Sequence, residues 1–239
     1  LAGTGTGANL LTLNSTTAGV AANLNVSGLA TGMNYLSVKD SNASSGKGVI
    51  ALNSTNVSNN TNWIFGIAGN NYWLNASGDG KWSTAANWST GVVPISTDSV
   101  IFSTVSTSVC SVDAGVASSI TLANLTLDTG YTGTVTLSAI SGRDLTVTNF
   151  ITINDGKLVD NGRTVNFKNA TFVGDFHRLT STGDWKMTDS GTIRFPAGSI
   201  FLNRLEIASG VTATMPDINS IGSLILGNNS NLTAMYLYI

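Results

Sequence analysis

Apolar residues recur every twenty positions over the second half of the chain. One column starts at Leu125, and a second starts two residues later at Leu127. The residue between the two columns is polar in most copies, for example Thr126 and Asn166. This is the alternation of a β-strand with one buried face. The first column is Leu125, Leu145, Val165, Trp185, Leu205 and Ile225, and the second is Leu127, Val147, Phe167, Met187 and Ile207.

A second strand and a less regular third one follow within each unit. The second carries the column Ile153, Val173 and Ile193, and the third lies around Val159, Leu179 and Ile200. A polar column marks the turns, with Thr129, Asn149, Asn169, Asp189 and Ser209. Three short strands per unit of about twenty residues predict an all-β fold, a right-handed parallel β-helix or β-solenoid. An antiparallel sandwich has no reason to keep such a fixed step.

The first part of the chain is less regular and suggests a division into three segments. Alternating pairs such as Leu11 with Leu13 and Leu36 with Val38 also predict strands, but their spacing is shorter and unequal. We therefore expect residues 1–66 to be β-solenoid turns that end one module. Residues 67–119 would form a Trp-rich junction or capping segment, and residues 120–239 the regular parallel β-helix.

Composition restricts the partners. Only 10% of the 239 residues are charged, and the net charge is −2. No basic patch exists to bind nucleic acid or an acidic membrane, and no apolar run is long enough for a transmembrane helix. The chain opens without an initiator Met, so we expect a fragment of a longer chain or a processed product, with targeting signals outside it.

Three tryptophans, Trp73, Trp82 and Trp88, lie in one short run rich in Gly, Ser and Asn. They are the candidate binding residues, and two interpretations are open. They could form a platform that stacks on sugar rings, or they could cap the apolar core where the regular stack begins. The capping interpretation is favoured, because a junction between modules has apolar area to cover.

Two stretches around these tryptophans carry a family resemblance. "YLSVKDSNAS … NNTNWIF" and "GDGKWSTAANWSTGVVPISTDSVIF" resemble modules of large secreted or cell-surface β-solenoid proteins of bacteria, similar in style to autotransporter passengers and filamentous adhesins. The resemblance runs from Tyr35 to about Phe150. It implies an extracellular or cell-surface location and a non-enzymatic role, and it brings no catalytic motif.

Catalytic candidates are few. Asp155 and Asp175 are twenty residues apart, as are Arg143 and Arg163, so each pair would stack on adjacent turns like the carboxylates and bases of polysaccharide-cleaving β-helices. A solvated ladder of turn residues also explains both pairs, and this interpretation is favoured because a single stacked pair is rarely catalytic. His177 is the one histidine and has no partner for a triad or a zinc site.

Metal and thiol chemistry also have little support. Cys110 is the single cysteine and is expected to be a small buried residue rather than a reactive thiol. Asp40, Asn42 and Ser44 alternate like the start of a Ca²⁺ loop, but Ala51 stands where the bidentate Glu should be. We expect no metal site and no cofactor.

The sequence therefore predicts an extracellular structural or adhesive β-solenoid segment that forms a stiff rod or filament and is not an enzyme. Its expected partners are further copies or modules joined end to end, and cell-surface glycans. The alternative is a carbohydrate-binding or polysaccharide-degrading β-helix, similar to tailspikes or lyases, that uses the tryptophans or one face of the helix.

Overall fold

The computed structural model describes residues 3–27, 33–46, 48–66, 69–173, 178–194 and 201–238. In this part of the chain the regular structure is β-strand, with no α-helix and one short 3-10 helix, η1 (Ala85–Asn87). Neighbouring strands of every sheet run parallel. The prediction of an all-β chain with parallel strands is confirmed.

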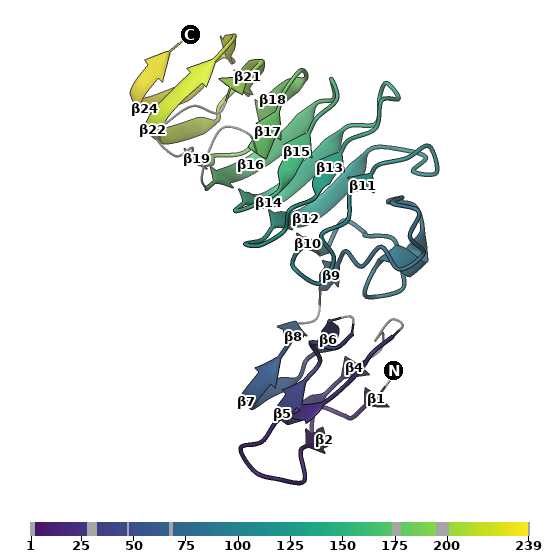
Figure 1. Cartoon of the computed structure of the whole chain (residues 1–239). Coiled ribbons are helices and arrows are strands. Elements are labelled where there is room, and N and C mark those ends of the chain that lie inside the picture. Colours follow the sequence, from purple (N-terminus) through teal and green to yellow (C-terminus); the bar gives the residue numbers. More distant parts are fainter. Residues whose placement is uncertain are drawn as a thin grey trace.

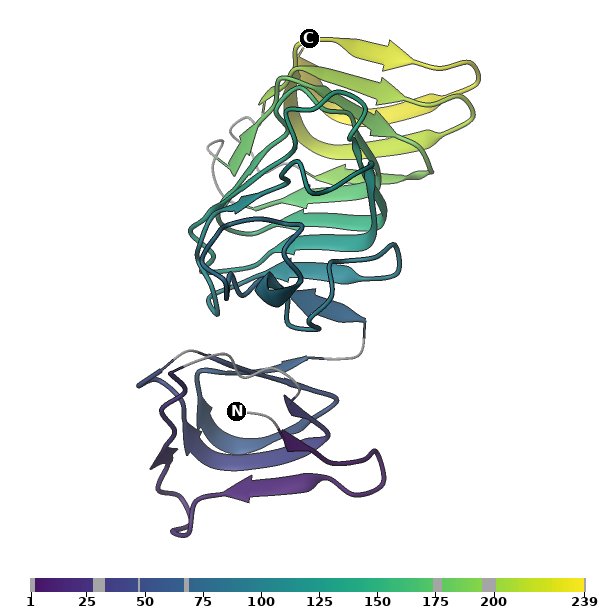
Figure 2. The same cartoon turned by 90° about the vertical axis from the view of Figure 1, so that its right-hand side faces the viewer.

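Residues 3–66 form two small sheets that face each other (Figures 1 and 2). One has the order β1-β4-β6-β8, and in the other β5 pairs with β2, β3 and β7. Their strands are β1 (Gly3–Thr4), β2 (Leu11–Asn14), β3 (Ala22–Asn23), β4 (Met33–Asn34), β5 (Leu36–Asn42), β6 (Val49–Leu52), β7 (Thr55–Thr61) and β8 (Trp63–Gly66).

The remaining strands form a large sheet of twelve strands and a sheet of four, β11-β13-β15-β17. Figure 2 shows the strands of the large sheet side by side, following one another along the length of this part of the molecule. The large sheet contains β9 (Asn70–Tyr72), β10 (Ser99–Phe102), β12 (Ile120–Leu127), β14 (Leu145–Ile153), β16 (Val165–Phe172), β18 (Asp184–Met187), β19 (Gly191–Arg194), β20 (Phe201–Leu202), β21 (Arg204–Ile207), β22 (Thr212–Ile221), β23 (Leu224–Leu226) and β24 (Asn231–Tyr238). The small sheet contains β11 (Cys110–Ser111), β13 (Thr134–Thr136), β15 (Lys157–Val159) and β17 (Leu179–Thr180).

The predicted twenty-residue column is present in the middle of the large sheet. Leu145, Val165, Trp185 and Leu205 lie opposite one another on successive strands, and all four side chains are buried. The second column runs in the same way through Val147, Phe167, Met187 and Ile207. Apolar residues that point inward on every strand bury a continuous strip of side chains between the sheets.

Both ends of these columns differ from the prediction. Leu145 lies opposite Ile120, not Leu125, because the stretch from β12 to β14 is longer than twenty residues. Leu205 lies opposite Leu224, which leaves Ile225 opposite Glu206 and 40% exposed. Leu125 is buried in another column, opposite Ile151. Because Ile120 and Leu125 are both apolar, the sequence spacing alone could not show which of them lies opposite Leu145.

An extra residue in β14 shifts the column that was predicted for the second strand of each unit, Ile153, Val173 and Ile193. From Val147 to Phe150 the strand has one residue more than either neighbour, which is a β-bulge. Phe150 is turned to the outside and is 53% exposed. Beyond the bulge Ile151 lies opposite Ala170, and Ala170 lies opposite Ile193. The predicted column of Ile153, Val173 and Ile193 is therefore wrong.

The column predicted for the third strand of each unit, around Val159, Leu179 and Ile200, is displaced by one residue at its first member. Leu158, not Val159, lies opposite Leu179, and the same column continues through Val135 to Cys110. Ile200, the third member of the predicted column, lies outside the described residues.

The described residues form two main hydrophobic cores, and a third cluster lies where they meet. One core belongs to residues 26–51, and the other runs from Trp73 to Ile221. Between them Ile50 from β6 packs with Tyr72 and Leu74, and Ile64 and Ile101 add to this contact. The division of the chain into three segments at residues 66 and 119 stays a prediction. The three tryptophans of residues 67–119 belong to the same core as residues 120–221.

Candidate functional site

The three predicted tryptophans come together in the segment between β9 and β10, which loops out beside the large sheet (Figure 1). Trp73 follows β9 directly and forms an antiparallel bridge with Trp88, which ends η1. The ring centroids of Trp73 and Trp88 are 5.0 Å apart, and those of Trp82 and Trp88 are 4.7 Å apart, both in edge-to-face contact. Phe102 from β10 packs against all three indoles.

This tryptophan cluster is buried. Trp73 and Trp88 are 0% exposed and Trp82 is 2% exposed. The Trp73 indole N–H donates to the Ser108 carbonyl at 3.2 Å, and that of Trp88 donates to the Trp82 carbonyl at 2.7 Å. Burial of such a ring stabilises the fold by roughly 3 kcal/mol. Sugar stacking requires an indole face open to solvent, and in this arrangement the faces are covered by protein, as capping requires.

A network of polar side chains holds the loop around the cluster. The Asp79 carboxylate accepts hydrogen bonds from the Lys81 backbone N–H (3.0 Å), the Asn87 amide (2.7 Å) and the Thr84 hydroxyl (2.7 Å). These bonds, led by the one from the Lys81 backbone, hold the pKa of Asp79 well below its ordinary value. The loop is therefore held by hydrogen bonds that favour the ionised form of this carboxylate.

The candidate pair Arg143 and Arg163 lies just after two turns, and each side chain binds a backbone carbonyl. Arg143 donates to the Ala114 carbonyl at 3.0 Å, and Arg163 donates to the Ile140 carbonyl at 3.2 Å. Gly183 follows Arg163 in this column, because a Cβ there would collide with the Arg163 carbonyl. The two arginines thus link successive turns of the chain.

Asp155 is also engaged. Its carboxylate accepts the Gly130 backbone N–H at 2.7 Å and forms an ion pair with Arg178 at 2.6 Å. Both contacts, the Gly130 bond first, lower the pKa of Asp155. Asp175 and His177 lie outside the described residues, so the predicted pairing of Asp155 with Asp175 stays a prediction.

The thiol and calcium candidates occupy structural positions. Cys110 is buried in the column with Val135, and burial raises the pKa of its thiol well above the usual value. Asp40 accepts the Gly19 backbone N–H and the Asn59 amide, and these bonds, the Asn59 one first, lower the pKa of Asp40. Within the described ranges, no three His, Cys, Asp or Glu side chains are placed to share a metal ion.

Two residues that the sequence did not single out prove informative. Asp160 is completely buried and accepts hydrogen bonds from several donors, including the Trp185 indole at 3.1 Å. Trp63 is the one tryptophan of the chain that is not fully buried. The signal for Trp63 was its place at the end of the polar run "NNTNW", where a bulky aromatic residue follows four polar ones.

No family model, curated protein or solved structure matches this chain. In the described part of the chain, no helical segment combines the length and the apolar character needed to cross a bilayer.

Proposed function

We propose that this chain is a non-catalytic structural or adhesive segment of an extracellular right-handed parallel β-helix, which forms a stiff rod or filament at a cell surface. One observation carries the proposal. Parallel strands follow one another from β9 to β24 with buried apolar columns between the sheets. A ladder of this kind can grow along its axis without changing its cross-section.

The parallel pairing also supports the right hand of the helix. Each strand of the large sheet reaches its parallel neighbour through a crossover, as β12 reaches β14 by way of β13. Crossovers between parallel strands are right-handed in about 98% of cases, because strands twist to the right.

The surface of the ladder supports a mechanical role. Polar side chains on the outer face bond to those of the next strand, as Asn124 does to Ser99 at 2.8 Å and Asn166 does to Thr146 at 3.4 Å. The second of these ladders continues from Asn166 to Lys186 and Glu206, which form an ion pair at 2.7 Å. Such side-chain contacts between successive strands stiffen the stack. The extracellular location rests on the resemblance to secreted bacterial β-solenoid modules and on the Ser-, Thr- and Asn-rich, weakly charged composition.

Electron microscopy of the native material tests this function. We expect long rods or cell-attached fibres with a repeat along the axis, and an axial spacing of about 4.8 Å between successive strands in fibre diffraction. Compact isolated particles would contradict the rod. Release of new reducing ends from polysaccharides incubated with the protein would contradict the non-catalytic role.

A further inference from the structure

Among the described residues, the large sheet lacks a strand beside the first half of β12. β14 pairs with β12 from Ile120 onward, but β10, on the other side, begins at Ser99 opposite Asn124. The same register would place Ile95 opposite Ile120, since each lies four residues earlier (99 − 95 and 124 − 120). The chain instead turns there, with the Asp98 N–H donating to the Ile95 carbonyl at 3.0 Å, and the Ile95 side chain is 57% exposed. One side of β12 is therefore unpaired over its first residues.

The backbone of β12 shows which groups are left unused. The Ile120 N–H donates toward β14, to the Asp144 carbonyl at 2.9 Å, whereas the Ala123 N–H donates toward β10, to the Asp98 carbonyl at 3.0 Å. Successive residues of a strand point their N–H and C=O groups to alternate sides, so Thr121 faces the same side as Ala123. Within the described residues, no hydrogen bond reaches the Thr121 N–H or carbonyl from that side. Such an edge is a template for another strand.

An open space of about 330 Å³ lies beside this edge, between the loop that precedes β10 and the start of β12. We call it the β12 slot. Trp82 and Ile120 in its lining are buried, and Val93 and Val116 in its lining pack against the same core. The slot therefore offers apolar contacts next to the unpaired backbone of Thr121.

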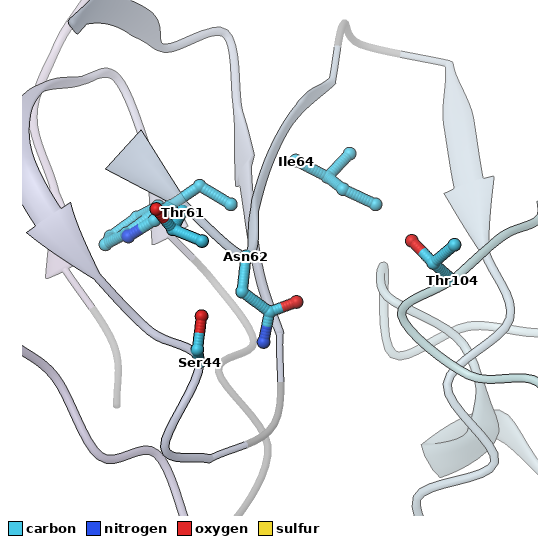
Figure 3. A pocket seen from close by; sticks show the side chains of 6 residues that line it. Ser44, Thr61, Asn62, Ile64 and Thr104 are labelled. Atoms are coloured by element: carbon cyan, nitrogen blue, oxygen red, sulfur yellow. The ribbon is translucent and has the colours of Figure 1, made fainter. Parts of the chain in front are cut away.

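The β12 slot differs from a larger pocket that lies between the two parts of the molecule. Figure 3 shows that pocket, with Ser44 and Asn62 on one side and Thr104 across it. Its width depends on the small cluster around Ile50 and Tyr72 that joins the two parts. The walls of the β12 slot all come from residues 82–121, beside the second core, so close packing within one core fixes their spacing.

The pattern of the sheet indicates what would fill the slot. The buried column that runs from Leu205 to Leu145 ends at Ile120. A strand in the slot would extend this column with one apolar residue opposite Ile120 and a second opposite Leu122. The residue between them would point outward, as the exposed Thr121 does. The strand that fits therefore alternates apolar and polar residues.

We propose that the β12 slot binds an extended segment of another protein chain, which joins the large sheet as a parallel strand. In a parallel ladder, the residues opposite Ile120 and Leu122 exchange hydrogen bonds with Thr121, and their side chains would enter the slot. None of the ten lining residues is ionisable, so we expect a neutral segment. This inference goes beyond the proposed structural role and does not depend on it, because a rod looks the same in the microscope with or without a bound strand.

The test is a calorimetric titration of the full chain with the peptide acetyl-SVTVTVS-amide, which has the alternation that the slot requires. We expect a Kd below about 1 mM. The matched control is the same peptide with an N-methyl group on each valine, which keeps the side chains but removes the N–H groups that would bond to Thr121. It should bind at least about tenfold more weakly. Hydrogen exchange read by mass spectrometry should slow in residues 118–123 when the first peptide binds.

Variants of the chain test the two sides of the slot. Thr121→Pro removes the N–H from the open edge, where a sheet tolerates proline, and should abolish binding, whereas Thr121→Val keeps the backbone and should bind as the original chain does. Ile95→Ser removes apolar area from the lining at an exposed position and should weaken binding several-fold. Val92→Ser is its control, because Val92 is 58% exposed and does not line the slot.

Circular dichroism checks that each variant folds, and Ile95→Ser keeps the test decisive if Thr121→Pro does not fold. The proposal is overturned if the peptide does not bind, if its N-methylated form binds equally well, or if Ile95→Ser and Val92→Ser bind it equally well. Unchanged binding to folded Thr121→Pro would also overturn it, as would slowed exchange confined to residues outside 118–123.

Discussion

At the scale of the residue, Asp160 shows how one buried polar group connects neighbouring turns of the chain. Its Oδ1 accepts the backbone N–H groups of Thr182 at 2.9 Å and Gly183 at 3.0 Å. Its Oδ2 accepts the indole N–H of Trp185 at 3.1 Å. A buried carboxyl group is tolerated only when such donors satisfy it.

Asp160→Ala should therefore destabilise the chain by about 3 kcal/mol, because it leaves several buried N–H groups without an acceptor. Chemical denaturation followed by tryptophan fluorescence measures the loss. Asp189→Ala is the matched control, since Asp189 forms an ion pair with Lys168 on the exposed surface, and its removal should produce no measurable change. Equal effects of the two substitutions would contradict the structural role of Asp160.

Asp79 makes the loop around the tryptophan cluster sensitive to acid. Its pKa is lower in the folded chain than in the unfolded one, so its contribution to stability is complete above the ordinary carboxyl pKa of about 3.9. The contribution declines as the pH falls below that value. Asp40, whose pKa is lowered by Asn59 and Gly19, should act in the same direction.

We therefore expect the near-ultraviolet circular dichroism of the tryptophans to weaken below about pH 4. Asp79→Asn should be less stable than the original chain at pH 7 and should lose less additional stability between pH 7 and pH 3. An identical pH profile for both chains would show that Asp79 does not hold the loop.

At the scale of the element, β16 tests the assignment of inward and outward faces. Val165 and Asn166 are neighbours, but Val165 is 0% exposed whereas Asn166 lies opposite Lys186 on the outer face. Val165→Asp should destabilise the chain by about 4 kcal/mol or more, because it places a charge in the core. Asn166→Asp should cost less than about 1 kcal/mol, since the new carboxylate faces solvent beside a lysine. Similar tolerance of both changes, measured by thermal unfolding, would disprove the register.

Sequence periodicity predicts this register only where successive strands are equally spaced. It succeeds from Leu145 to Leu205 and fails at Leu125 and Ile225. The failures have a physical cause, because the connecting stretches differ in length: Leu145 follows its partner Ile120 by 25 residues (145 − 120), and Leu224 follows its partner Leu205 by 19 (224 − 205). A fixed step of twenty misses both partners, and at Ile225 the slip of one residue turns the side chain to the outer face. The bulge at Thr148 and Asn149 adds a change of phase that no local pattern announces.

At the scale of the whole molecule, the contact between the two parts depends on a few apolar side chains. On β10, Val100 and Phe102 point into the second core, and Ile101 points to the cluster with Ile50 and Tyr72. This cluster is small compared with either core. The two parts should therefore lose their fixed relation before either part unfolds.

Ile101→Ser should loosen this contact while each core remains folded, because it removes apolar area at the contact alone. Small-angle X-ray scattering should show an increased radius of gyration, and circular dichroism should keep its β signal. Ile140→Ser, at a position already 41% exposed, is the control and should leave the scattering unchanged. Unfolding of the whole chain by Ile101→Ser would mean that the two parts form one cooperative unit.

The all-β class, the parallel column from Leu145 to Leu205 and the grouping of Trp73, Trp82 and Trp88 could be predicted from the sequence, since each depends on alternation or on proximity along the chain. The ends of the columns, the burial of those three indoles and the partial exposure of Trp63 could be seen only in the folded chain. It also supplied the donors that surround Asp160. These features arise from contacts between residues far apart in the sequence, and the unequal lengths of the intervening stretches fix which residues meet.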